Sequence, residues 1–170
     1  MSNPSKSRIR YFLVCVTASA LGSASLTSAA DPPSFTIDLP AGSACTFELR
    51  IDGSGGNQVY REFLDKNNNI ARTLTAGTGS ALTFTNVGTG ATFSSKSNGA
   101  VTHVTNNPDG SSTWVTTGHN VLILFPTDTP AGPSTTLHVG RVVFTVDASF
   151  NFALQQHNGQ ATDICAALSP

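Results

Sequence analysis

Four histidines and one aspartate are the side chains best suited to catalysis in this chain. The histidines are His103, His119, His138 and His157. Neutral imidazole can exchange protons near neutral pH or bind zinc or copper. The spacing contains neither His-x-His nor His-Glu-x-x-His, so the sequence predicts no metal site and no cofactor. His119, Asp128 and His138 flank a proline-rich connection and are the catalytic candidates if the protein is a small hydrolase.

Other catalytic patterns are weaker. The Gly-x-Ser-x-Gly elbow of serine hydrolases does not occur. Glu48 and Glu62 are the only glutamates, and a hairpin joining their segments would place them about 5 Å apart, as in retaining glycosidases. Glu62 would then also face Arg72, and an ordinary surface ion pair explains that arrangement more simply. The sequence therefore favours a protein without catalytic activity.

Trp114 and Tyr60 are the candidate ligand-binding residues. Trp114 is the only tryptophan, and Tyr60 is the only tyrosine after residue 30. Aromatic rings stack against the apolar face of sugars. Trp114 falls on a predicted strand beside Val104, where the pattern fits either a core or an exposed side chain.

The N-terminus has the three parts of a secretory signal peptide. Basic residues near position 8 precede an apolar stretch at 11–21, and small residues at 28 and 30 fit cleavage after Ala30. The apolar stretch is shorter than the about 20 residues of a spanning helix. We expect residues 1–30 to be a signal peptide and residues 31–170 to be one exported, extracellular domain without a membrane span.

Charge narrows the range of partners. Cleavage would leave six basic residues against ten acidic ones, a formal charge of −4. An acidic domain is poorly suited to bind nucleic acid or an anionic membrane. The expected partner is therefore an extracellular ligand, either a carbohydrate or a protein.

Two cysteines remain after the predicted cleavage. Cys15 lies in the signal peptide, which leaves Cys45 and Cys165. An even pair in an oxidising compartment predicts one disulfide. This bridge would fasten an early strand to the C-terminal segment.

Short alternating runs of apolar and polar residues fill residues 31–170, and Gly, Asn, Asp and Pro clusters separate them. The alternation predicts strands that each bury one face. We expect a single-domain, all-β antiparallel sandwich of about eight to eleven strands. The alternative is an up-and-down barrel around an apolar cavity.

Three turns predict hairpins. The turn at 53–56 would pair 45–52 with 58–65, and the turn at 65–69 would place Leu64 opposite Ile70 and Glu62 opposite Arg72. The third turn, at 107–110, would join 101–105 to 112–116.

The second half contains a central strand and a stiff connection. Residues 121–125 are apolar at every position, which predicts a strand covered on both faces. Gly140 predicts a bulge, or a bend where a strand changes sheets. The connection from Pro126 to Ser134 contains three prolines and predicts either a crossover between sheets or a place for binding residues. Residues 161–168 fit a short helical turn or a last strand.

Several segments resemble small exported proteins of actinobacteria. They are REF at 61–63, DKNNN at 65–69, HNVLILFPTD at 119–128, PAGPSTT at 130–136 and ATDIC at 161–165. The resemblance would span nearly all of residues 31–170 and implies export and an all-β domain. It carries over no catalytic residues, because that group has no assigned activity.

We therefore expect a secreted, non-catalytic domain that binds a ligand or a partner. The alternatives are a small extracellular hydrolase that uses His119, Asp128 and His138, and a lipocalin-like carrier of an apolar ligand.

Overall fold

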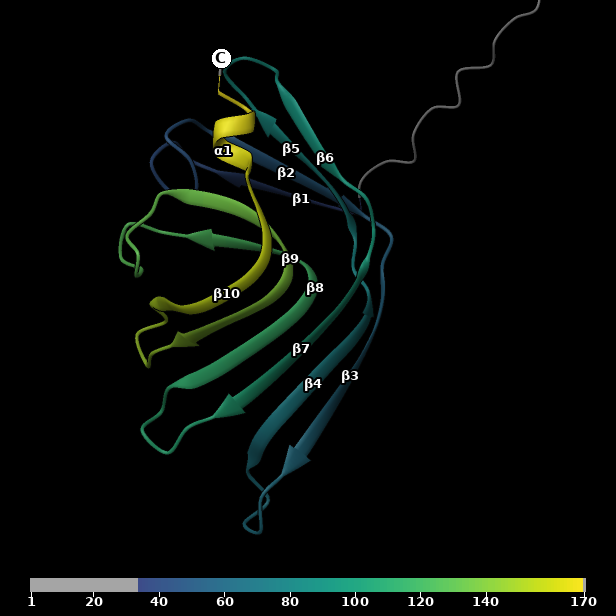
Figure 1. The fold of residues 1–170 in the computed structure, drawn as a ribbon, viewed down its shortest axis with the longest axis vertical. Coiled ribbons are helices and arrows are strands. Elements are labelled where there is room, and N and C mark those ends of the chain that lie inside the picture. Colours follow the sequence, from purple (N-terminus) through teal and green to yellow (C-terminus); the bar gives the residue numbers. More distant parts are fainter. Residues whose placement is uncertain (1–33, 170) are drawn as a thin grey trace, which may run out of the picture. The chain divides into compact units, whose positions relative to one another are not determined.

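The structure is a computed structural model that describes residues 34–169. The predicted signal peptide at 1–30 lies outside these residues. The described chain forms ten strands and one short helix (Figure 1). The elements are β1 (Phe35–Leu39), β2 (Leu49–Ser54), β3 (Asn57–Leu64), β4 (Ile70–Thr78), β5 (Ala81–Asn86), β6 (Thr92–Ser95), β7 (Gly99–Asn106), β8 (Ser112–Leu124), β9 (Ser134–Val146), β10 (Phe152–Asp163) and α1 (Ile164–Ala167).

The strands form two antiparallel sheets. One sheet has the order β1-β2-β5-β6, and the other has the order β10-β9-β8-β7-β4-β3. The expected all-β sandwich is confirmed. The six-stranded sheet does not close into a barrel, because β10 and β3 lie at its opposite edges.

The first core holds the two sheets together. Leu49 and Ile51 of β2 and Phe84 of β5 are buried in it. Ile164 and Leu168, in and just after α1, are fully buried in the same cluster. Further contacts come from β8 and β9, whose Val121, Ile123 and Leu137 are partly buried against it. Residues 161–168 were predicted to form a short helical turn or a last strand. They contain both, because β10 ends at Asp163 and α1 follows it.

A row of glycines crosses the six-stranded sheet. Gly118 on β8 pairs with Gly140 on β9, which pairs with Gly159 on β10. Their φ angles are +91°, +142° and +119°, values that side chains with a Cβ rarely adopt. A Cβ on any of the three would lie 2.2 Å from a carbonyl oxygen of a neighbouring strand. Figure 1 shows β8, β9 and β10 curving back on themselves. Neither form expected at Gly140 is present. The pairing of β9 with β8 and β10 runs through Gly140 without a bulge, and β9 stays in the same sheet on both sides of the bend.

A second core is built from β8, β9 and β10. Its buried members are Leu122, Leu124, Val142, Phe144 and Val146. Trp114, Phe152 and Leu154 pack against them and are partly buried. The central strand predicted at 121–125 is covered on both faces as far as Leu124, since Val121 and Ile123 contact the first core while Leu122 and Leu124 belong to the second. Phe125 lies beyond the end of β8 and is exposed, so the prediction was wrong for that residue.

The second and third predicted hairpins form, whereas the first does not. Val104 pairs with Trp114 across the 107–110 turn, and Leu64 pairs with Ile70. The prediction for the turn at 53–56 was wrong, because β2 pairs with β1 and β5 while, within residues 34–169, β3 pairs only with β4. The alternation of apolar and polar residues in β2 is compatible with β3 or with β5 as its neighbour, so it does not decide between them. Gly55 and Gly56 connect β2 to β3, which lies in the other sheet.

The register of the β3–β4 hairpin also differs near its turn. An irregularity after Phe63 places that residue opposite Arg72 and Glu62 opposite Thr73. The Arg72 guanidinium then lies over the Phe63 ring, 4.4 Å from its centroid. A cation–π contact thus replaces the expected Glu62–Arg72 ion pair.

Candidate functional site

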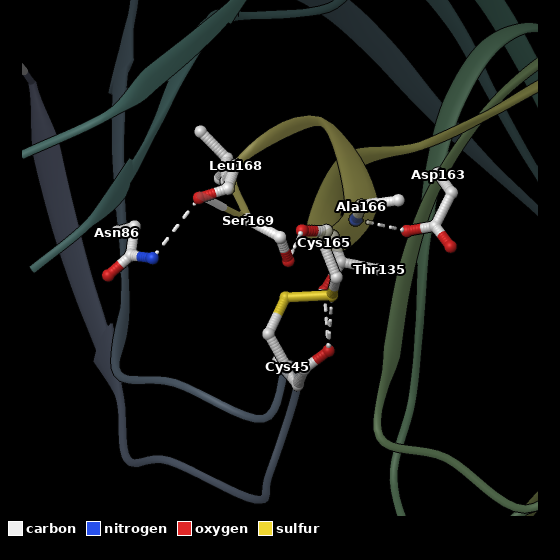
Figure 2. Close-up of a disulfide and its surroundings, with 9 residues drawn as sticks. Cys45, Asn86, Thr135, Asp163, Cys165, Ala166, Leu168 and Ser169 are labelled. Carbon is white, nitrogen blue, oxygen red and sulfur yellow. Dashed lines mark hydrogen bonds between the residues drawn. A yellow bond between two sulfur atoms is a disulfide. The ribbon is translucent and has the colours of Figure 1, made fainter. Parts of the chain in front are cut away.

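The predicted disulfide joins Cys45 to Cys165 across a sequence separation of 120 residues. Figure 2 shows the bridge beneath α1. Around it, the Thr135 hydroxyl donates to the Ala44 carbonyl at 3.0 Å, and the Asn86 amide donates to the Leu168 carbonyl at 3.2 Å (Figure 2). Asp163 caps α1 by accepting from the Ala166 amide at 2.9 Å. The disulfide and the Asn86 bond fasten the C-terminal segment to the loop before β2 and to the end of β5, and the Thr135 bond joins β9 to the same loop.

The three catalytic candidates do not come together. Because His119 pairs with Val139 and Asn120 pairs with His138, His119 and His138 project from opposite faces of the sheet. Asp128 is buried and uses both carboxylate oxygens on backbone amides, accepting from Phe125 at 2.6 Å and from Phe152 at 2.7 Å. No hydrogen bond joins any two of the three within residues 34–169.

Asp128 belongs to the connection that was predicted to cross between sheets. That connection instead joins β8 to its neighbour β9. It is fastened to the start of β10 by a short bridge between Thr129 and Ala153. The Asp128 carboxylate therefore holds a loop against a sheet edge.

The two glutamates are also separated. Glu62 lies on β3, which pairs with β4, while Glu48 directly precedes β2 in the other sheet. Glu62 accepts a hydrogen bond from the Tyr60 hydroxyl at 3.1 Å. The pairing expected of a retaining glycosidase does not form.

Of the two aromatic candidates, Trp114 packs against another ring, whereas Tyr60 has an exposed ring and donates its hydroxyl to Glu62. Trp114 is half-buried, stacks on Phe144 with ring centroids 5.6 Å apart, and donates its indole N–H to Ser112 at 2.9 Å. Tyr60 is 56% exposed on β3. Only Tyr60 therefore presents most of its ring to a ligand.

Tyr60 belongs to an exposed apolar surface on a sheet edge. All eight residues of β3 are exposed. Five large apolar or aromatic side chains of the β3–β4 hairpin are exposed, and we call them the hairpin patch: Val59, Tyr60, Phe63, Leu64 and Ile70. The opposite edge, β10, differs because it has a bulge after Leu154 and is partly covered by Thr129.

A pair of histidines meets at the bend of the sheet. The rings of His138 on β9 and His157 on β10 have centroids 4.6 Å apart. His138 is 5% exposed, and its Nδ1 atom has no hydrogen-bond partner among the residues that the structure describes. Burial, together with the neighbouring His157, lowers the pKa of His138. Sequence spacing did not reveal this pair, because the two residues meet only through the bend.

Phe150 is a second residue that sequence patterns did not single out. It is 81% exposed and has a φ of +64°, an unfavourable combination for a bulky side chain. The same turn geometry occurs at 65–69, 107–111 and 147–151, where the first residue bonds to the fourth and fifth. The shared pattern of Asp65 with Asn69 and Asp147 with Asn151 could have revealed the relationship.

The apolar space near the first core is a surface groove. It has a volume of about 390 Å³ and opens between β1, β2 and the end of β8. Apolar side chains line it, among them Ile37, Leu39, Val121 and Phe125. This groove differs from the enclosed barrel cavity expected of a lipocalin-like carrier.

Comparison with models of known protein families finds no match, and comparisons with curated proteins and with solved structures find none either. In the part of the chain that the structure describes, no helix is long and apolar enough to cross a membrane. Residues 34–169 also contain no group of three or more His, Cys, Asp or Glu side chains arranged to hold a metal ion.

Proposed function

We propose that this protein is exported and acts as a non-catalytic interaction domain, and that β3 receives an extended strand of a partner protein. The observation that carries the proposal is the open edge of β3, with the hairpin patch around it. Export is supported by the signal-peptide pattern of residues 1–30 and by the disulfide, which suits an oxidising compartment.

An open edge strand favours a polypeptide partner. The outer side of β3 carries backbone N–H and C=O groups that no neighbouring strand pairs within residues 34–169. Such a row is a template for an added strand, whose backbone supplies affinity while side-chain contacts supply specificity. Val59 and Phe63 lie on one face of β3 and Tyr60 on the other. An added strand could therefore make apolar contacts on both faces.

The hydrolase and carrier alternatives have less support. His119 and His138 project from opposite faces, and Asp128 is engaged by two backbone amides. The apolar groove beside β1 is open to the surface. A carbohydrate ligand would need an aromatic platform, and on β3 only Tyr60 and Phe63 supply aromatic rings.

Site-specific photo-cross-linking in the producing culture tests the proposal. A benzoylphenylalanine side chain is placed at Tyr60 on β3 or, as the control, at the exposed Gln160 on β10. We expect Tyr60 to give one discrete protein adduct and Gln160 to give little. Adding Val59→Lys and Phe63→Lys should remove most of the adduct, because lysines block edge pairing, whereas Gln156→Lys on β10 should not.

Two outcomes would contradict the interaction proposal: equal adducts from both edges, or an adduct that persists after the two lysines are introduced. Export is tested separately by the mass of the protein recovered from the medium. Cleavage after Ala30 is expected, and retention of the intact chain inside the cell would contradict it.

A further inference from the structure

We propose that His138 and His157 bind one divalent transition-metal ion of the Cu(II) class at the inner side of the sheet bend. This site is independent of the hairpin patch, which lies on other strands of the sheet.

The bend brings together two residues that a flat sheet would separate. On β10, His157 pairs with Val142, while Ala161 pairs with His138. His138 and Val142 are four residues apart on β9, about 13 Å in an extended strand. The ring centroids of the two histidines are nevertheless only 4.6 Å apart. The Gly140–Gly159 pair lies between them and permits this approach.

Two unpaired polar atoms mark the same place. In the described part of the chain, the buried side-chain atoms without a hydrogen-bond partner are His138 Nδ1 and Asn120 Nδ2. These residues lie directly opposite each other on β9 and β8. A buried polar atom without a partner is unfavourable and calls for an explanation such as a bound ion or water. A cation would accept the lone pair of His138 Nδ1. Asn120 Nδ2 is a donor, so it needs a separate acceptor, such as a water molecule that is not bound to the ion.

The ring separation agrees with shared coordination. A metal–nitrogen bond of about 2.0–2.1 Å places an ion about 3.2 Å from the centre of each ring. For an ion placed on the centroid-to-nitrogen axis of both rings, a centroid separation of 4.6 Å corresponds to an angle of about 90° at the ion. That angle fits the tetragonal geometry of Cu(II) or Ni(II) better than tetrahedral zinc. Water molecules would complete the coordination.

The surroundings keep the imidazoles available as ligands. His157 Nε2 lies 3.4 Å from the Gln160 carbonyl oxygen, which can only accept, so Nε2 carries the proton and Nδ1 is the nitrogen left to bind a metal. The residues opposite His138 on its two neighbouring strands are Asn120 and Ala161, neither of which is charged. Asp163 lies two residues beyond Ala161 and is engaged as the cap of α1. Metal binding requires deprotonated imidazole, so affinity should rise with pH.

Titration of the untagged full chain with Cu(II), followed by calorimetry and electron paramagnetic resonance, tests the site. The variants are His157→Gln and His138→Gln, with the exposed His103→Ala on β7 as the control. We expect one ion per chain and a spectrum showing coupling to imidazole nitrogen. Each site variant should bind at least about tenfold more weakly, since even indirect contacts to a metal contribute about 10–100-fold. The control should bind unchanged.

Circular dichroism checks that each variant is folded. If His138→Gln does not fold, the binding measured for His157→Gln decides the result, because His157 is only half-buried. The proposal is overturned if the wild-type chain binds no Cu(II) at millimolar concentration. It is also overturned if folded His157→Gln binds as tightly as the wild type.

Discussion

Phe150 occupies a turn position that suits glycine or asparagine. The matching positions of the two related turns are Asn68 and Gly110, which also have positive φ angles. A residue with a Cβ is disfavoured there by about 1–2 kcal/mol. Since Phe150 is 81% exposed, packing offsets little of this strain.

Replacing Phe150 with glycine should therefore stabilise the fold. We expect Phe150→Gly to raise the free energy of unfolding by up to about 1 kcal/mol, because glycine's greater chain entropy offsets part of the relieved strain. Urea denaturation measures the change. Asn68→Gly is the control and should change stability less, since asparagine tolerates this conformation. A destabilised Phe150→Gly variant would contradict the account.

The aspartates that begin two of these turns make stability depend on pH. Asp65 accepts from the amides of Asn67 and Asn69, and Asp147 accepts from those of Ser149 and Asn151. The pKa of Asp65 is lowered chiefly by the backbone bond from Asn69, and that of Asp147 chiefly by the Asn151 side chain. The folded state thus favours the ionised form of both carboxyl groups.

The direction of the pH effect follows from these lowered pKa values. A carboxyl group with a lowered folded pKa stabilises the fold above its unfolded pKa of about 3.9, and this stabilisation is lost as pH falls through the folded value. We expect the Tm to fall on acidification below about pH 4, and to fall less in Asp65→Asn/Asp147→Asn. Identical Tm profiles for the variant and the wild type would contradict this assignment.

At the residue scale, the sequence predicted features that depend on neighbouring residues or on the number of residues of one type. Two cysteines allow one bridge, and Cys45–Cys165 forms. The turn at 107–110 requires only its own residues. The His138–His157 pair was not predictable from the sequence, because the two rings approach each other only through the positive φ angles of Gly140 and Gly159. The spacing of the histidines along the chain does not indicate these backbone angles.

The bend of the six-stranded sheet passes through the row of paired glycines Gly118, Gly140 and Gly159. A Cβ at Gly140 would lie 2.2 Å from the Asn158 carbonyl oxygen, in a conformation with φ +142°. A side chain at this position would therefore be disfavoured both by the close contact and by the positive φ, and the bend around the second core would be destabilised. Gly140 also lies at the bend that brings His138 close to His157, so the fold and the proposed metal site both depend on it.

Gly140→Ala should lower the free energy of unfolding by about 2–4 kcal/mol, from backbone strain and the displaced strand. Gly99→Ala on β7 is the matched control, since nothing lies within 4 Å of its Cβ position. It should change stability by less than about 0.5 kcal/mol. Chemical denaturation compares the two. Equal effects would show that the row does not carry the bend.

At the scale of elements, alternation predicted strands but did not choose their neighbours. The run at 49–54 buries Leu49 and Ile51 against β5 rather than against the adjacent β3. A short glycine turn usually returns a strand beside itself, and here it connects two sheets. Partner choice is decided by the whole core, which includes Phe84 and residues near the C-terminus.

The disulfide stabilises the whole described molecule. It closes a separation of 120 residues and lies beside the fully buried Ala44. Removing it through Cys45→Ser/Cys165→Ser should lower the free energy of unfolding by about 2–5 kcal/mol. Guanidinium denaturation measures the loss, and adding reductant to the wild type should reproduce it. A difference below about 0.5 kcal/mol would contradict a stabilising role for the bridge.

The sandwich as a whole was predictable because short alternating runs, turn clusters and the absence of helical periodicity all indicate the same class. The uncovered edge was not, because it depends on which strand ends the sheet. The turns at 53–56 and 65–69 predicted that β3 would pair with the strands before and after it, but in the described part of the chain it pairs with β4 alone. That outcome leaves Val59, Tyr60 and Leu64 exposed.

Hydrogen exchange of the β3 amides tests the interaction proposal most directly. The protein is isolated from the medium with its partner, and exchange in residues 57–64 is compared with that of the protein alone. An added strand should slow exchange in β3, because its outward amides gain hydrogen bonds, while β10 at the opposite edge stays unchanged. Unchanged exchange in β3, with protection elsewhere, would contradict binding at this edge.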